Sequence, residues 1–553
     1  MQQTNRLTLP DLFRESVRNN PTNKSLGFVD ENFETYESMD QKIQAVIAFM
    51  EKAGIKPGDK VAILSSNMPN WGIVYFAITF MGSVVVPILP DFSATEIENI
   101  LNHSEAKALF VSAGLINKTE QLKSDHLELK VRLDDLSVLT SRTEVSFDAL
   151  EKPEKEYDIA EDSLAAIIYT SGTTGKSKGV VLTHKNIAFT AVKTKTIQEV
   201  NATDRFLSIL PLSHTYENTL GFILPMISGS SVAYLKKAPT PAVLLPALRK
   251  VKPTLMLSVP LVIEKIYRNK VLPSLTKNTL SRTLYKVPPV RKQLHRLAGK
   301  KLLKTFGGEI KFFGIGGAKL DKYVERFLRE AKFPYAIGYG LTETAPLLAG
   351  ANATHTKYQS TGPVMEGVTL KIHNPDPKTG EGEIWAKGDN VMQGYYKEPE
   401  LTKEVITEDG WFKTGDLGVF DKNGYLYIKG RSKNMIIGDN GENIYPEEIE
   451  TVINNFRHVV ESIVVKQKGK LVALVHFNAD EIEQKYQTLK HEITSYVETK
   501  REELRKELHE YINTHVSRFS RIQKIYIQDN PFEKTPTQKI KRFLYQKTHK
   551  NDR

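Results

Sequence analysis

Short apolar runs separated by helical patterns recur along the first part of this 553-residue chain. They are found at Lys60–Ser65, Ser83–Leu89, Lys107–Val111, Ser230–Leu235, Leu255–Val259 and Ile310–Ile315. Apolar runs of this length that alternate with helices are typical of parallel strands covered by helices on both faces. We therefore expect an α/β fold built on parallel sheets. The chain is too long for a single core, so more than one domain is expected.

The uncharged stretch from Val61 to Pro90 raises the alternative of a membrane span. Proline and glycine interrupt it at Pro69, Gly72, Gly82, Pro87 and Pro90. A buried helix over Trp71–Met81, followed by a strand, explains the stretch better than a transmembrane helix. The first twenty residues have no apolar core of a secretory signal, so we expect a cytoplasmic protein.

The sequence pattern changes at Gly362. Strands are expected at Val368–Ile372, Gly382–Trp385 and Tyr425–Ile428, joined by Pro/Gly/Asp turns. We predict an N-terminal domain over 1–431, with a small β-rich subdomain over about 362–431. A mobile α+β domain over 432–553 should follow, with a helix at Pro446–Phe456 and two strands at Ser462–Lys466 and Leu471–Phe477. The charged segment 480–517 has helical apolar spacing and is expected to form an exposed amphipathic pair or hairpin.

The densest local signal is Leu164–His184, which reads LAAIIYTSGTTGKSKGVVLTH. An apolar strand runs into a segment rich in Gly, Ser, Thr and Lys, and apolar residues then resume. Glycine permits close backbone approach, while hydroxyls, N–H groups and lysines attract anions, so a polyphosphate site is predicted. Only two residues separate Gly172 from Gly175, so this is not a Walker A loop.

Charge and cysteine content limit the chemistry. The net charge is +11, which favours anionic partners such as nucleotides, coenzyme phosphates, nucleic acid or an anionic membrane. The chain has no cysteine, which excludes disulfides, a cysteine nucleophile and thiolate metal sites. A thiol for any thioester chemistry must therefore come from a partner.

The segment YTSGTTGKSKGVVLTH resembles the phosphate-binding signature of the adenylate-forming superfamily, which includes acyl- and aryl-CoA synthetases. Five further segments resemble that family's motifs in the same order: PLSHTYE from Pro211, FGIGGA from Phe313, GYGLTET from Gly338, WFKTGDL from Trp411, and GRSKNMII from Gly430 with GENIYPEEIE after it. A final segment, EKTPTQKIK from Glu533, resembles the family's terminal lysine motif. There Gln538 replaces the usual glycine before Lys539, which puts the local loop geometry in question.

The resemblance implies a role for each matching residue. It implies nucleotide binding by Thr170, Ser171, Gly172, Thr173, Thr174, Gly175, Lys176, Gly317, Ala318, Tyr339, Gly340, Asp416 and Arg431. It implies catalysis by Lys539, Thr342 and Glu343, with Glu343 also a Mg²⁺ ligand. It implies acyl-substrate contacts by His214, Gly316 and Gly338, and a hinge at Lys433.

The same resemblance implies ATP, Mg²⁺ and coenzyme A as cofactors and co-substrate. The expected reaction is activation of a medium- to long-chain fatty acid as acyl-AMP, followed by thioester formation. An acyl carrier protein as acceptor, an aryl or other acid as substrate, and a degenerate nucleotide- or lipid-binding member are the alternatives. No basic stripe with interleaved aromatics on a known binding module is present, so no nucleic-acid partner is expected.

One basic segment lies outside these motifs. Twelve Lys/Arg and no acidic residue lie between Lys265 and Gly308, interleaved with apolar residues. The hypothesis is peripheral contact with the inner face of an anionic membrane. A solvated basic loop and a contact to coenzyme phosphates are the alternatives.

Overall fold

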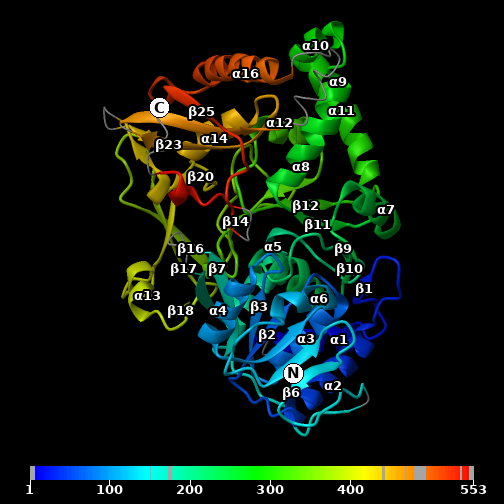
Figure 1. Cartoon of the computed structure of the whole chain (residues 1–553). Coiled ribbons are helices and arrows are strands. Elements are labelled where there is room, and N and C mark those ends of the chain that lie inside the picture. Colours follow the sequence, from blue (N-terminus) through cyan, green and yellow to red (C-terminus); the bar gives the residue numbers. More distant parts are fainter. Residues whose placement is uncertain are drawn as a thin grey trace.

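The computed structural model describes residues 6–149, 151–171, 177–438, 442–467, 469–478, 493–535 and 539–546. Two sheets flanked by helices form its larger part (Figure 1). The first has the strand order β18-β8-β7-β3-β2-β4-β5-β6. Its members are β2 (Lys60–Leu64), β3 (Val84–Ile88), β4 (Ala106–Val111), β5 (Leu129–Arg132), β6 (Val138–Ser141), β7 (Leu164–Ser171), β8 (Ser177–Thr183) and β18 (Gly394–Tyr395).

The inner strands of this sheet are parallel, whereas β6, β8 and β18 pair antiparallel. Its helices are α1 (Leu9–Asn19), α2 (Tyr36–Lys52), α3 (Pro69–Phe80), α4 (Ala94–Ser104) and α5 (His184–Ile197). Helix α3 is the uncharged segment considered above for a membrane span. It packs against the core with Trp71 through Phe80 all buried. In the part of the chain that the structure describes, no helix is long and apolar enough to cross a membrane.

The second sheet is parallel throughout, with the order β1-β10-β9-β11-β12-β13. Its strands are β1 (Leu26–Phe28), β9 (Arg205–Leu207), β10 (Ser231–Tyr234), β11 (Leu255–Ser258), β12 (Phe312–Ile315) and β13 (Tyr335–Ile337). Its helices are the π-helix η2 (Glu217–Ile223), α6 (Leu224–Met226), α7 (Pro241–Val251), α8 (Pro260–Ile266), the π-helix η3 (Tyr267–Val271), α9 (Leu272–Leu275), α10 (Thr279–Lys286), α11 (Pro288–Thr305) and α12 (Lys322–Glu330). The predicted α/β class with parallel sheets is confirmed.

The β-rich part is a four-stranded antiparallel sheet of order β16-β17-β19-β20. Its strands are β16 (Val368–His373), β17 (Gly382–Gly388), β19 (Phe412–Phe420) and β20 (Leu426–Arg431). Strand β19, which contains Asp416, was not among the expected strands. Alternate residues of β19 are buried, which is the pattern of a strand with one covered face.

The C-terminal part has its own apolar core. Helix α14 (Pro446–Asn454) packs on a sheet of β23 (Val459–Gln467), β24 (Lys470–Phe477) and β25 (Lys524–Gln528). The expected amphipathic pair over 480–517 stays a prediction, because residues 479–492 lie outside the described residues; the described part of the segment forms helix α16 (Ile493–His515). Leu504, Leu508 and Ile512 lie one turn apart on α16 and are buried in this core, so they form the apolar face of this helix.

Candidate active site

The predicted site segments leave the carboxyl ends of neighbouring parallel strands. Gly316–Ala318 follows β12, and Gly338 follows β13, which lies next to β12 in the sheet. The Gly338 N–H donates to the Ile315 carbonyl at 3.0 Å. Ligand sites in parallel α/β sheets form at this edge because the loops that follow the strands converge there.

The segment after β13 brings three predicted residues together. Tyr339 and Gly340 form β14 (Tyr339–Gly340), which pairs with β15 (Leu347–Ala349), and Thr342 and Glu343 lie on the 3-10 turn Thr342–Thr344. A side-chain carbon on Gly340 would lie 1.7 Å from the Pro346 carbonyl oxygen, so only glycine fits there. The turn is therefore held close to the strand from which it departs.

Asp416 and Arg431 are joined to this segment across the β-rich sheet. They are direct partners on β19 and β20, and Arg431 Nε lies 2.7 Å from Asp416 Oδ1. The Tyr339 hydroxyl donates to Asp416 Oδ2 at 2.8 Å. Asp416 is only 5% exposed. Burial raises the pKa of Asp416, while Arg431 and Tyr339 oppose that rise and favour the carboxylate.

Glu343 offers a carboxylate to a cation. Its Oε1 accepts a hydrogen bond from the Tyr395 hydroxyl at 2.9 Å, and the Met392 N–H donates to its carbonyl. Among the described residues no cluster of three or more His, Cys, Asp or Glu side chains could hold a metal. This donor set fits Mg²⁺, which is commonly bound by one or two carboxylates with water and substrate phosphates.

The polyphosphate loop lies between β7 and β8. Thr170 is paired with Lys178 and Ser171 with Ser177, so the ladder extends beyond the apolar run into the polar segment. Thr170 and Ser171 are therefore strand residues, whereas Gly172, Thr173, Thr174, Gly175 and Lys176 lie outside the described residues. The Lys178 ammonium lies 5.1 Å from the centre of the Tyr395 ring. Because the Tyr395 hydroxyl donates to Glu343, Lys178 and Glu343 contact the same tyrosine.

Lys539 reaches the same site from the far end of the chain. Its backbone closes a turn in which the Thr535 N–H donates to the Lys539 carbonyl at 2.7 Å. Burial of the ammonium group, together with the nearby Arg431, lowers the pKa of Lys539, and Asp416 and Glu343 oppose this. The structure thus brings Lys539, Asp416, Arg431 and Glu343 into one electrostatic cluster. Lys433 lies on the 3-10 turn Ser432–Asn434 just after β20.

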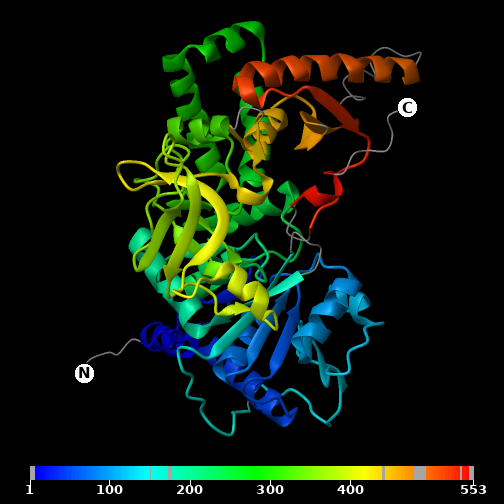
Figure 2. The same cartoon turned by 90° about the vertical axis from the view of Figure 1, so that its left-hand side faces the viewer.

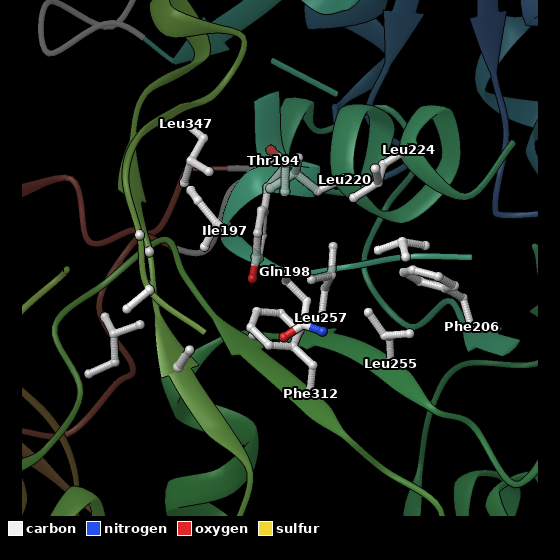
Figure 3. A pocket seen from close by; sticks show the side chains of 18 residues that line it. Thr194, Ile197, Gln198, Phe206, Leu220, Leu224, Leu255, Leu257, Phe312 and Leu347 are labelled. Carbon is white, nitrogen blue, oxygen red and sulfur yellow. The ribbon is translucent and has the colours of Figure 1, made fainter. Parts of the chain in front are cut away.

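An apolar cavity is lined in part by Gly338, the residue before Tyr339. Figure 3 shows the side chains around it. No charged residue lines it, and only three of its lining side chains are polar. Its open volume is about 50 Å³. It is lined by Thr194, Ile197, Gln198, Val200, Phe206, Tyr216, Leu220, Leu224, Leu255, Leu257, Phe312, Gly314, Ala336, Ile337, Gly338, Leu347, Gly350 and Ala351.

Of the three residues predicted for the acyl side, only Gly338 lines this cavity. His214 and Gly316 contact Tyr216, which does line it. The Tyr216 N–H donates to His214 Nδ1 at 3.3 Å, and a side-chain carbon on Gly316 would lie 3.1 Å from Tyr216 Cζ. Burial, and to a smaller extent Lys539, lower the pKa of His214 to about 4, so this histidine is neutral at neutral pH.

Three polar residues at the site were not predicted. Tyr395 comes from the short edge strand β18, Tyr216 stands directly before η2, and Glu217 begins η2. Tyr216 and Glu217 lie within the motif PLSHTYE, so their closeness to His214 in the sequence could have indicated that they belong to the site. Tyr395 belongs to no recognised motif, and only the pairing of β18 with β8 brings it to the site.

The AMP-binding enzyme family matches residues 13–396. The chain belongs to this family. Two relatives are long chain acyl-CoA synthetase 1 of Arabidopsis thaliana (29% identity, 98% of this chain and 90% of the relative) and the chloroplastic long-chain-fatty-acid–[acyl-carrier-protein] ligase AEE15 of the same plant (28% identity, 81% and 73%). The fold is shared with the o-succinylbenzoate CoA synthetase MenE of Bacillus subtilis in complex with its acyl-adenylate (TM-score 0.76, 21% identity, 97% and 98% covered).

Family membership makes the chain an adenylate-forming ligase. ATP with Mg²⁺ and coenzyme A as co-substrate belong to this activity. The donor set around Glu343 and the buried Asp416–Arg431 pair are consistent with it.

Proposed function

We propose that this AMP-binding enzyme activates a medium- to long-chain fatty acid as acyl-AMP and transfers the acyl group to coenzyme A. The apolar cavity carries the proposal. Its lining presents no charge and includes Gly338, the residue before Tyr339, which suits an aliphatic chain whose carboxylate points towards Lys539. At about 50 Å³ the cavity must widen to admit the whole chain. Burying each methylene of such a chain is worth about 0.8 kcal/mol, so an uncharged cavity favours a fatty acid over a short polar acid.

In the first half-reaction a carboxylate oxygen attacks the α-phosphorus of ATP. A new P–O bond forms, the bond to the bridging α–β oxygen breaks, and pyrophosphate leaves. Lys539 and Thr342 offer donors to the developing negative charge, and electrostatic stabilisation of this kind is the main contribution to such transfers. Mg²⁺ on Glu343 would neutralise phosphate charge.

Asp416 and Arg431 have a positioning role in this proposal. The buried carboxylate accepts hydrogen bonds from ribose hydroxyls, while Arg431 and Tyr339 keep it ionised and fixed. Neutral His214 accepts a hydrogen bond from the Tyr216 N–H and is close enough for the Lys539 charge to act on it, so it contributes a dipole and not a second positive charge.

In the second half-reaction a thiolate attacks the acyl-adenylate carbonyl, the C–S bond forms, and AMP leaves with the electron pair of the broken C–O bond. Lys539 stands beside Arg431, Asp416 and Glu343, which supports reading this state as the adenylating one. We propose that residues 432–553 then turn as a domain about Lys433, which withdraws Lys539 and admits the thiol. The chain has no cysteine, so the thiol belongs to the co-substrate.

The thiol that receives the acyl group could also belong to an acyl carrier protein, because one relative is named as an acyl-carrier-protein ligase. The decisive experiment measures AMP and pyrophosphate release with Mg·ATP over acids from acetate to oleate plus benzoate, with and without coenzyme A. AMP release that requires both a fatty acid and coenzyme A supports the proposal. Pyrophosphate exchange without thioester would favour a carrier protein, and activity with benzoate alone would contradict the fatty-acid assignment.

A further inference from the structure

The basic segment identified in the sequence forms a projection of helices that the proposed reaction does not use. It comprises η3, α9, α10 and α11 with the residues between them, and we call residues 265–304 the basic projection. In Figure 1 and Figure 2, α10 lies at the outer edge of the molecule, and α11 leads back to the body.

The charge of the basic projection is free to act on a partner. Ten of its twelve cations are exposed: Lys265, Lys270, Lys277, Arg282, Lys286, Lys292, Arg296, Lys300, Lys301 and Lys304. In the part of the chain that the structure describes, none of these ten has a carboxylate at ion-pair distance. Only Arg268 and Arg291 are paired, with Glu264 and Glu330. A surface of one sign, without internal compensation, attracts an anionic partner.

Large apolar side chains are exposed among these cations. Leu280 and Leu284 lie one turn apart on one face of α10, and the exposed Val287 follows directly in the extended residue between α10 and α11. Leu280 is 69% exposed and Leu297 on α11 is 65% exposed. A helix face that joins apolar and basic residues matches the interface of an anionic bilayer, which has acyl chains beneath negative headgroups.

The aromatic residues of the basic projection argue against nucleic acid. Binding of single strands uses exposed aromatic rings on which bases stack. Here the Tyr267 hydroxyl lies 2.9 Å from that of Tyr285, whose hydroxyl also contacts His295 Nε2 at 2.8 Å. Both rings are engaged internally, so aliphatic side chains alone accompany the exposed charge.

We infer that the basic projection docks this enzyme onto an anionic membrane surface, with Leu280, Leu284 and Val287 inserted between headgroups. The inference goes beyond the proposed reaction and does not depend on which acid is activated.

The test is co-sedimentation of the full-length protein with phosphatidylcholine vesicles, with or without phosphatidylglycerol. Three variants are compared with wild type: R282E/K286E/K300E and L280S/L284S/V287S in the projection, and K237E/K378E/K422E as a control with the same charge change at exposed lysines elsewhere. We expect wild type and the control to bind anionic vesicles, and both projection variants to bind at least about tenfold more weakly, since each basic residue and each buried apolar group contributes.

Binding by both projection variants at the wild-type level would overturn the inference. An equal loss in the control variant would also overturn it, because net charge alone would then be responsible. Binding of a duplex oligonucleotide in place of vesicles would assign the projection to another partner. Acid-dependent pyrophosphate exchange with a soluble medium-chain acid checks that each variant is folded. Its absence in wild type would count against the proposed function and leave the vesicle result unaffected.

Discussion

Asp416 and Arg431 are direct cross-strand partners in β19 and β20, and their side chains meet at 2.7 Å beneath the Tyr339 hydroxyl. The pair links a residue after β13 to the last residue before the turn that holds Lys433. The buried carboxylate of Asp416 therefore contacts both Tyr339, on the nucleotide side of the site, and Arg431, two residues before the predicted hinge residue Lys433.

Replacing Asp416 with Asn should weaken ATP binding. The neutral amide accepts fewer hydrogen bonds and leaves Arg431 without its counterion. We expect the KM for ATP to rise about tenfold to a hundredfold, the range for losing a charged hydrogen bond. Initial rates with varied ATP measure this. An unchanged KM for ATP would contradict a ribose role for Asp416, whereas the KM for the acid is the internal control.

Replacing Lys539 with Ala should separate the two half-reactions. Adenylation should fall by about 10²–10³, the scale of deleting one electrostatic stabiliser. Thioester formation from supplied acyl-AMP should remain near wild type. Because the pKa of Lys539 is lowered, wild-type adenylation should decline with rising pH before the ordinary lysine range is reached. Equal losses in both half-reactions would refute the proposed withdrawal of Lys539.

Replacing Leu224 with Trp should shorten the preferred acyl chain. In Figure 3 Leu224, Phe206 and Leu255 lie at one end of the cavity, and Leu347 lies at the other, beside Gly338. The larger ring would exclude about two methylenes, which corresponds to about tenfold in kcat/KM for a long acid. Rates across a series of acids measure this, with short acids unaffected. Uniform loss over all lengths would show that Leu224 does not lie at the methyl end.

Replacing Glu217 with Gln should stabilise the protein in a pH-dependent way. Glu217 is 2% exposed, its Oε1 accepts from Ser208 Oγ at 2.5 Å, and burial raises the pKa of Glu217 to about 8. Below the ordinary value of 4.5 both folded and unfolded states are protonated. Between 4.5 and 8 only the unfolded state ionises, so the wild-type fold loses stability as the pH rises.

Gln cannot ionise, so its advantage should grow over this window by about 3 to 5 kcal/mol. Urea unfolding at both ends of the window measures it. The exposed Glu144→Gln is the matched control and should show a constant difference. A constant difference for Glu217→Gln as well would mean that Glu217 is ionised in the folded protein.

Replacing Arg268 with Ala should favour the thioester-forming state. Arg268 Nη1 donates to the Asn454 carbonyl at 2.6 Å and Nη2 to Asn455 Oδ1 at 2.9 Å, which ties the second sheet's helices to α14. Without these bonds we expect adenylation to slow by about three- to tenfold. Single-turnover rates of each half-reaction measure the split. Parallel slowing of both would indicate general destabilisation instead.

The sequence by itself determined the elements and their class. Short uncharged runs such as Val84–Ile88 indicated buried strands, and the glycine-rich segments indicated where backbone approaches ligand, because these properties are local. The stripe of Leu504, Leu508 and Ile512 likewise predicted helix, although not that these residues would be buried in the C-terminal core.

Tertiary structure decided what depends on register and on contacts between distant segments. Strand pairing sets Asp416 opposite Arg431, edge strand β18 brings the Tyr395 hydroxyl to Glu343, and the Tyr216 ring lies between Gly316 and the cavity. Shifting β19, β20 or β18 by one residue would turn Asp416, Arg431 or Tyr395 to the other face of its sheet at no cost in local propensity. Packing of the whole chain selects one register, and the site exists only in that register.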